Sequence, residues 1–197
     1  PINAQGFGFT RGVGLLRVRG RGARLECGLV YPDPRDAAAA VSFCHGTGYG
    51  PRAFAVGGFG LALVESDGAH LESSYFAQGL GYWHGFGGMY FKGNEARIQS
   101  RRYGQGAGIH TALGALDMEG RDNRLLHWGV GPGFGWDRGV GSVSVRGERN
   151  ELYADWASGK GDDNGHGFVW IEGSGNRIRL GELATGTLKR SSPSYGV

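Results

Sequence analysis

One charged, glycine-containing phrase recurs along the chain at a nearly constant interval. It reads EGRDNRL at residues 119–125, RGERNEL at 146–152 and EGSGNRI at 172–178, with looser copies at 19–25, 65–71 and 92–98. The phrases end on Leu25, Leu71, Ile98, Leu125, Leu152 and Ile178. From Leu71 onward the steps are 27, 27, 27 and 26 residues, whereas the first step is 46. A fixed period in this range is typical of a solenoid, in which each repeat packs on its neighbours.

Glycine content favours strands over helices as the repeating elements. Of the 197 residues 41 are glycine, and an interior glycine weakens a helix by up to about 1 kcal/mol relative to alanine. The segments GGMYFKG, GALDMEG and GSVSVRG alternate apolar and polar residues, which is the period of a strand. We therefore expect an all-β chain: a right-handed parallel β-helix over residues 1–180, with 27 residues per coil and roughly six to seven coils. Residues 181–197 would form a C-terminal cap or tail.

Each coil would contain three short strands. The first carries Phe86, Leu113 and Val140 in successive coils, the second carries inward-pointing side chains, and the third ends the phrase. The expected inward side chains are Met89, Phe91, Leu116, Met118, Val143 and Val145.

Charges and asparagines within the phrase support this stacking. The residue before the glycine, or before Ser66, alternates in sign in successive copies: Arg19, Glu65, Lys92, Glu119, Arg146 and Glu172. Stacked about 4.8 Å apart on one outer face, like charges would repel and opposite charges would attract. Asn123, Asn150 and Asn176 form a second column, and asparagine favours turns because its amide bonds to neighbouring backbone. The phrase is therefore predicted to be the turn between two strands.

The motif G-x-x-N-x-[LI] at coil spacing resembles right-handed parallel β-helix proteins of the pectate-lyase-like type. The coils YGQGAGIHTALGAL and GPGFGWDRGVG are also similar to Gly-rich repeats of uncharacterised bacterial proteins, whose coils carry a Gly-Asp-Asp-x-Tyr turn. Here GRDNRL and GERNEL stand in place of that acidic turn, so a metal-binding role of those acids is not carried over. The resemblance covers residues 5–180 and implies a fold rather than an activity.

The long first step indicates an insertion of 19 residues beyond the period of 27, placed around residues 28–43. The prolines and four alanines of GLVYPDPRDAAAAVSF predict a loop followed by a short helix, serving either as a lid or partner-binding arm or as a plain cover of a coil edge. Cys27 and Cys44 flank this insertion. Alignment places Cys44 in the Leu71 column and Cys27 two residues beyond Leu25, roughly 8 Å away. Two buried free thiols are therefore expected.

The candidate functional residues lie where successive coils differ chemically. Aligning residues 81–87, 108–114, 135–141 and 162–168 gives an inward column of Tyr82, Ile109 and Trp136. The next, outward column reads Trp83, His110, Asp137 and Asn164, and the one after reads His84, Thr111, Arg138 and Gly165. His84 and Arg138 would point inward by alternation unless a turn intervenes.

Stacking would place His110 beside Asp137, where the carboxylate could orient the imidazole as a general base. These two are the catalytic candidates. Arg138 could hold an anionic group and Trp83 could stack on a sugar ring. His84, Thr111 and Asn164 complete the expected ligand-binding set. The alternative is that these columns are surface ion pairs and cross-strand hydrogen bonds only.

Other features narrow the choice of function. A net charge of +3 is too small to indicate nucleic acid, and no apolar run is long enough to cross a membrane. The G-x-G patterns lack the strand–helix context of a nucleotide loop, so no cofactor is expected. Asp162, Asp163 and His166 lack a fourth ligand, so no metal site is expected. An outer column is rich in cations and is either a site for acidic polysaccharide or a solvated face: Arg24, His70, Arg97, Arg124, Glu151 and Arg177.

Three hypotheses follow. The chain binds or processes polysaccharide in an extracytoplasmic bacterial protein, or it is a non-catalytic structural module of a larger protein. In the second case another domain or a second copy covers the N-terminal coil edge, because exposed strand edges invite pairing. The third is an enzyme that uses His45 or His110 in a cleft beside the insertion.

Overall fold

The computed structural model describes residues 4–28, 32–33, 36–54, 56–156, 158–180 and 195–196. These residues form a parallel β-solenoid and contain no helix. About four turns follow the regular spacing of 27 residues, fewer than the six to seven coils expected. Of the predicted cap or tail, only residues 195–196 are described, and the rest lies outside the described residues.

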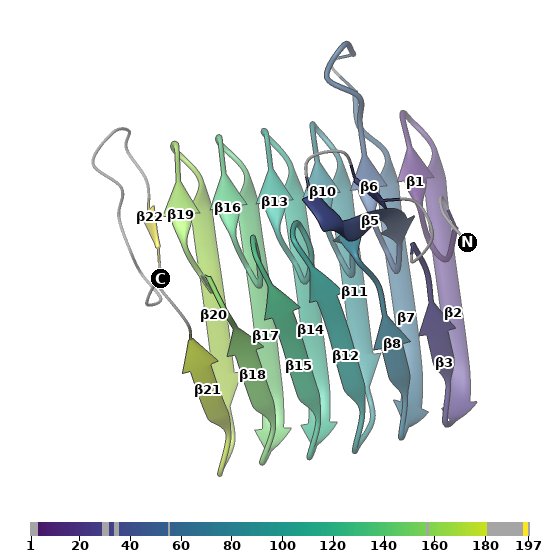
Figure 1. Cartoon of the computed structure of the whole chain (residues 1–197), viewed down its shortest axis with the longest axis vertical. Coiled ribbons are helices and arrows are strands. Elements are labelled where there is room, and N and C mark those ends of the chain that lie inside the picture. The colour runs from purple at the N-terminus through teal and green to yellow at the C-terminus, as the bar shows by residue number, and fades with distance from the viewer. Residues whose placement is uncertain are drawn as a thin grey trace.

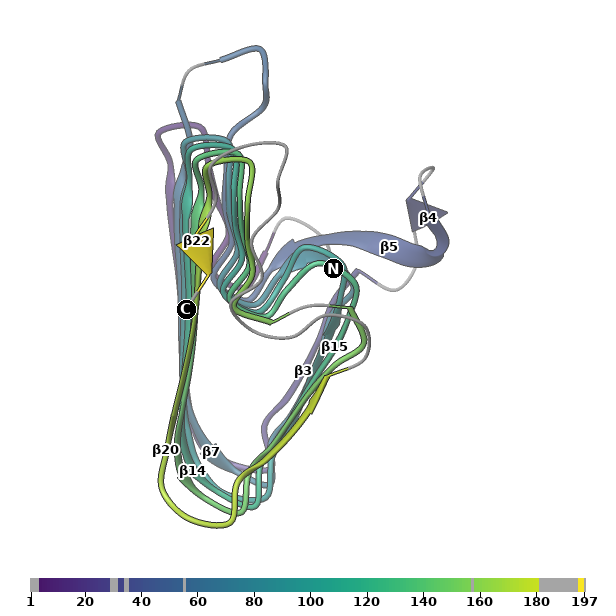
Figure 2. The ribbon, with the colours of Figure 1, turned by 90° about the vertical axis from the view of Figure 1, so that its left-hand side faces the viewer.

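Three parallel sheets form the walls of the solenoid (Figures 1 and 2). The long sheet contains β2 (Val13–Arg21), β7 (Phe59–Asp67), β11 (Phe86–Lys92), β14 (Leu113–Arg121), β17 (Val140–Glu148), β20 (His166–Glu172) and β22 (Tyr195–Gly196). The short sheet contains β1 (Gly8–Phe9), β6 (Gly48–Tyr49), β10 (Gly81–Tyr82), β13 (Gly108–Ile109), β16 (Gly135–Trp136) and β19 (Gly161–Asp162). The oblique sheet contains β3 (Arg24–Glu26), β8 (His70–Glu72), β12 (Arg97–Arg101), β15 (Arg124–Trp128), β18 (Glu151–Ala154) and β21 (Arg177–Leu180).

The main core lies between the long and oblique sheets. Side chains alternate along each long strand, and all six predicted inward residues from Met89 to Val145 are buried there together with Leu71, Ile98, Leu125 and Leu152. Phe86, Leu113 and Val140 do not form a separate strand. They begin the long strands and, by alternation from Gly87, Gly114 and Gly141, face outward. The core prediction is confirmed, and the strand division is wrong at this corner.

Glycine columns bring the short sheet directly against the upper half of the long sheet. A Cβ on Gly114 would overlap the carbonyl oxygen of Ala107, and one on Gly81 would overlap that of Leu113. Since Gly81 faces the long sheet, Tyr82, Ile109 and Trp136 point to the other side. The sequence predicted that they face into the coil, but they lie outside the main core. They pack in a second, aromatic cluster with residues that include Phe76 and Tyr103.

The insertion forms strands where a loop and a short helix were expected. Strands β4 (Pro32–Asp33) and β5 (Asp36–Cys44) make an antiparallel hairpin that projects from the solenoid (Figure 2), and β5 also pairs with β9 (Tyr75–Ala77). The excess length is divided between two places. The step from Gly8 to Gly48 is 40 residues, thirteen above the period, and the step from Gly48 to Gly81 is 33, six above it. The second part is the loop that protrudes between β6 and β7 in Figure 1.

Cys27 and Cys44 are joined by a disulfide, contrary to the expectation of two free thiols. The alignment behind that expectation was wrong, because Cys44 pairs with Ala77 rather than standing in the Leu71 column. The two Cα atoms are 6.8 Å apart. The bond joins the end of β5 to the residue after β3 and so closes the base of the hairpin.

Candidate functional site

The predicted ligand-binding residues lie on the turns that lead from the short sheet to the long sheet, at the top of Figure 1. Each turn has two successive residues with positive φ, for example His110 at 59° and Thr111 at 55°. Two left-handed residues reverse the chain direction and break the strand alternation. His84 and Arg138 are therefore exposed and do not point inward.

The second residues of these turns form one exposed row, which we call the upper turn row: His84, Thr111, Arg138 and Asn164. The register differs by one residue from the alignment at the last coil. Trp136 pairs with Asp162, so Asp163 follows Asp137 and Asn164 belongs with His84 and Arg138. The sequence alignment matched the flanking glycines incorrectly, because one residue is missing from that coil.

His110 is the centre of a hydrogen-bonded group behind this row. Its Nδ1 lies 2.8 Å from Oδ2 of Asp137, as the stacking argument predicted. Its Nε2 lies 2.8 Å from a terminal guanidinium nitrogen of Arg52, a residue that the sequence argument missed. The rings of Tyr82, Trp83 and Trp136 all lie within 5.5 Å of the imidazole centre. Only 9% of the His110 side chain is exposed.

Arg52 and Phe54 belong to the loop between β6 and β7, which contains the six-residue excess. Besides His110, the Arg52 guanidinium donates to the Tyr82 hydroxyl at 3.1 Å and lies 5.9 Å from the Trp83 ring centre. The Trp83 indole donates to the Phe54 carbonyl at 2.8 Å. The loop is thus held against the turns. The sequence could have indicated this loop only if the excess residues had been divided correctly between the hairpin and the loop after β6.

This arrangement satisfies both ring nitrogens of a neutral imidazole. With the proton on Nδ1 toward Asp137, Nε2 accepts from the permanently charged Arg52. We assign this tautomer from the hydrogen-bond network. A general base needs a free lone pair facing the proton that it removes, and here Arg52 occupies that position. A catalytic role for His110 and Asp137 would require Arg52 to move away, and it stays a prediction.

Asp163 extends this hydrogen-bonded group into the next coil. Its Oδ2 accepts a hydrogen bond of 2.6 Å from the Trp136 indole, and Arg138 lies 3.6 Å from the Asp137 carboxylate. Carboxylates therefore hold the aromatic and cationic side chains in place, while the Arg138 side chain remains 70% exposed. Of the predicted residues, His110 and Asp137 are brought together, and the upper turn row is left open to solvent.

The cation-rich column on the oblique sheet is in register as predicted, but it is largely neutralised. Arg124 lies 2.9 Å from Glu151, which also lies 3.4 Å from Arg179. His70 lies 3.4 Å from Glu72. Partly exposed pairs of this kind contribute little to stability, and they reduce the positive field that an acidic polymer would require. The solvated face is the better description of this column.

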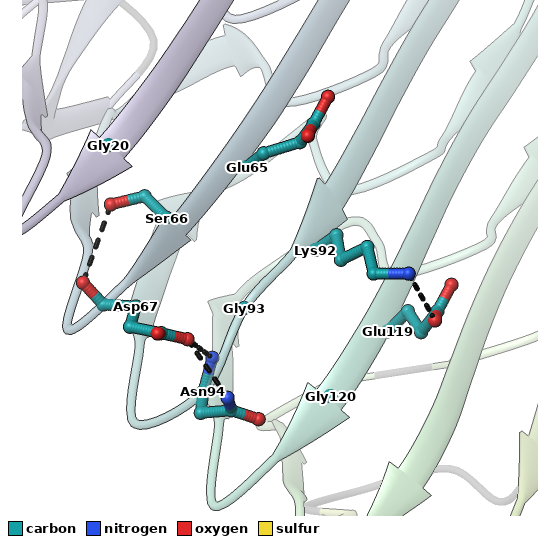
Figure 3. Close-up of a pocket in the computed structure, with 9 residues that line it drawn as sticks. All are labelled: Gly20, Glu65, Ser66, Asp67, Lys92, Gly93, Asn94, Glu119 and Gly120. Carbon is teal, nitrogen blue, oxygen red and sulfur yellow. Dashed lines mark hydrogen bonds and ion pairs between the residues drawn. The ribbon is translucent and has the colours of Figure 1, made fainter.

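The repeated phrase forms the opposite edge of the solenoid, around a groove of about 420 Å³ (Figure 3). Asn94 donates to Asp67 through both its backbone and side-chain nitrogens, each at 2.9 Å. Lys92 lies 2.9 Å from Glu119. These polar groups bond to one another between coils, so the edge joins coils as the turn prediction required.

A depression of about 450 Å³ at the corner between the oblique and short sheets escaped the sequence argument. Trp128 and Trp156 line it with Arg101, Arg102 and Asp155. The Asp155 carboxylate accepts from the Gly129 backbone at 2.6 Å. The sequence signal was present, because Trp128 and Trp156 follow the phrase in consecutive coils.

Comparison of the chain with models of protein families, with curated proteins and with solved structures finds no match. Among the residues that the structure describes, no helix is long and apolar enough to cross a membrane.

Proposed function

We propose that this chain is a non-catalytic binding domain for a polysaccharide, which lies along the upper turn row. The observation that carries the proposal is the row itself: an imidazole, a hydroxyl, a guanidinium and a carboxamide, all exposed, one per coil. Neighbouring strands are about 4.8 Å apart, so the row presents hydrogen-bonding groups at a short, regular interval to an extended polymer. Trp83 adds a half-buried aromatic face at one end.

The hydrogen bonding of His110 favours binding of a polysaccharide over its cleavage. Both of its ring nitrogens are engaged, Arg52 also contacts Tyr82 and Trp83, and Asp137 also lies near Arg138. The likeness of the repeat to pectate-lyase-like β-helix proteins concerns the fold alone and implies neither a polysaccharide ligand nor an extracytoplasmic bacterial origin. Both belong to this proposal.

The test is affinity electrophoresis of the folded chain in gels that contain neutral or acidic polysaccharides. We expect retardation by at least one polymer, and a loss of affinity of about tenfold in Arg138→Ala, because a charge-assisted hydrogen bond contributes about 1.5 kcal/mol or more. Arg121→Ala is the matched control, since Arg121 is an exposed residue at the end of β14, on the opposite edge. Absence of retardation across the panel, or equal losses in both variants, would overturn the proposal.

Two further variants test a different binding site and a catalytic role. If Trp156→Ala abolishes retardation and Arg138→Ala does not, the polymer binds in the corner depression rather than on the upper turn row. If the wild-type chain shortens the bound polymer and His110→Gln does not, the domain is catalytic. Each result would replace the proposal with a specific alternative.

A second candidate function, docking to another domain or copy, is favoured by the outer face of the long sheet. Val13, Phe59 and Leu113 are exposed by 76%, 40% and 50%, and they stand in one row with Phe86 and Val140. Phe59 stacks on Phe86 at 4.7 Å. Sedimentation velocity over a range of concentrations should show association that Phe59→Thr with Leu113→Thr removes. A concentration-independent monomer would exclude self-association.

A further inference from the structure

A compact group of metal-ligating atoms lies far from the upper turn row, at the base of the hairpin. The sulfur atoms of Cys27 and Cys44 and a ring nitrogen of His45 all lie within 4.8 Å of one another. The exposed fractions are 2% for Cys27 and zero for Cys44 and His45. Among the described residues, no other three histidine, cysteine or acidic side chains come this close. In the structure the two sulfurs form a disulfide.

His45 is buried without a hydrogen-bond partner on either ring nitrogen. Neither ring nitrogen is engaged, so the imidazole keeps a nitrogen lone pair available for a ligand. A buried polar side chain without a partner is rare in folded proteins and requires an explanation. The buried side-chain oxygen of Gln5 also lacks a donor.

The equivalent positions in other coils show what His45 lacks. Hydrogen bonds between coils place Gln5, His45, Gln78 and Gln105 in one column. Gln105 donates to the Gln78 side chain at 3.0 Å and to the Leu126 carbonyl at 2.9 Å, and Gln78 donates to the Gln99 carbonyl at 2.8 Å. Gln78 and Gln105 thus donate from their side-chain nitrogens, although the buried oxygen of Gln105, like that of Gln5, has no donor. At position 45 an imidazole replaces glutamine, beside the two cysteines.

We propose that reduction of the Cys27–Cys44 disulfide converts this group into a site for a thiophilic divalent metal ion such as Zn²⁺. A dithiol reductant supplies two electrons and two protons, so the S–S bond breaks, two cysteine thiols form, and the reductant becomes a disulfide. Metal binding then releases those two protons as the thiolates coordinate. His45 supplies the third ligand through its free ring nitrogen.

The charge and the donor types select this class of metal. Two thiolates and one divalent cation sum to zero, which limits the cost of placing ions in a buried site. Sulfur and imidazole donors suit Zn²⁺, whereas Mg²⁺ and Ca²⁺ require oxygen donors. Water or the Gln5 oxygen could complete four-coordination.

A metal at this site would also preserve a connection that reduction otherwise removes. The disulfide spans 17 residues and closes the base of the β4–β5 hairpin. Coordination by Cys27 and Cys44 would close the same loop. The hairpin would therefore be tied to the solenoid under both oxidising and reducing conditions.

The test titrates Co²⁺, as a spectroscopic substitute for Zn²⁺, into the whole chain under anaerobic conditions with a phosphine reductant. We expect one equivalent to bind with thiolate-to-cobalt charge-transfer absorption, to be displaced by Zn²⁺, and to bind only after reduction. His45→Gln introduces the residue that the same column uses at Gln78, so it should fold and lose affinity about tenfold or more. His84→Gln, at an exposed site, is the matched control.

Circular dichroism during the titration shows whether the reduced chain is still folded. If reduction alone loosens the fold, Zn²⁺ should restore the β signal in the wild type and not in Cys27→Ser with Cys44→Ser. The proposal is overturned if the reduced, folded chain gives no charge-transfer band. It is also overturned if Zn²⁺ fails to restore the fold of a loosened chain, or if His45→Gln binds as tightly as the wild type. None of these outcomes depends on polysaccharide binding.

Discussion

Asn123 and Asn150 each join two consecutive coils through the two ends of one side-chain amide. The Asn123 oxygen accepts from the Ala96 backbone at 2.9 Å, and its nitrogen donates to the Gly93 carbonyl at 2.8 Å. Both side chains are essentially fully buried. An asparagine is required here because it offers a donor and an acceptor at the right separation in a neutral group.

Asn123→Ala should destabilise the chain by about 2–4 kcal/mol, since it leaves a buried backbone donor and a buried backbone acceptor unpaired. Urea unfolding followed by circular dichroism would measure this change. Asn164→Ala serves as the control: the side chain is exposed, so only the positive φ of 62° should cost, by about 1 kcal/mol or less. Equal losses of unfolding free energy in the two variants would contradict a structural role of the asparagine hydrogen bonds between coils.

His127 should make the stability of the fold depend on pH. It is completely buried, and burial lowers its pKa from 6.5 to about 3, against a smaller opposing effect of the Val130 backbone. Below pH 6.5 the unfolded chain takes up a proton that the folded chain does not bind. Stability due to this residue is therefore complete above pH 6.5 and falls as the pH decreases toward 3, by up to about 1.4 kcal/mol per pH unit.

The corresponding measurement is the free energy of unfolding of wild type and His127→Gln between pH 7 and 4. The variant should lose about 1 kcal/mol less per pH unit within this window, whatever its stability at pH 7. An identical slope in wild type and His127→Gln would show that the imidazole can be protonated in the folded state.

At the scale of elements, glycine decides how the short and long sheets meet. Gly81 and Gly114 stand where a side chain would collide with the backbone of the opposite sheet. The long sheet therefore meets the short sheet through backbone in the upper half of each coil, and it meets the oblique sheet through side chains in the lower half. This difference lets one coil hold both an apolar core and a tight double layer (Figure 2).

Gly114→Ala should cost about 3 kcal/mol or more, because the added methyl group meets backbone that cannot move without displacing a sheet. Gly68→Ala is the comparison: it has positive φ but no atom within 4 Å of a Cβ, so only about 1 kcal/mol is expected. Thermal and urea unfolding of both variants would test this order. A smaller loss at Gly114 than at Gly68 would mean that the sheets are not in backbone contact.

At the scale of the whole molecule, each coil is stabilised only by its neighbours. Core residues of β11 and β14 are at most 2% exposed, whereas Leu16 and Val18 in β2 and Val169 and Ile171 in β20 are only partly buried. In such an array local opening begins at the outer coils and spreads inward.

Hydrogen exchange followed by mass spectrometry should therefore show a gradient in this chain. Peptides that cover β11 and β14 should be the slowest to exchange, and those that cover β2 and β20 should exchange at least about tenfold faster, since about 1.4 kcal/mol of local stability corresponds to a factor of ten. Equal protection along the long sheet would indicate a single cooperative unit instead.

Most of the fold could be predicted from the periodicity of the sequence. The phrase endings, the alternating charges and the asparagine column all repeat at one interval, and only stacked coils place such residues in contact. Ion pairs such as Lys92–Glu119 and the asparagine bonds occur where the repeat predicted them. The contact between His110 and Asp137 was predictable for the same reason, because both residues belong to regular coils.

What departs from the period was decided only by tertiary structure. The excess of 19 residues could be placed anywhere in the first repeat, and the repeat does not indicate its division between the hairpin and the Arg52 loop. The Cys27–Cys44 pairing and the engagement of Arg52 with His110 both follow from that division. The sequence alone determined how the coils stack, because residues that recur at the same place in each coil lie against their counterparts in the next coil. Where the inserted segments fold back was left to three-dimensional packing, because no repeated neighbour constrains them.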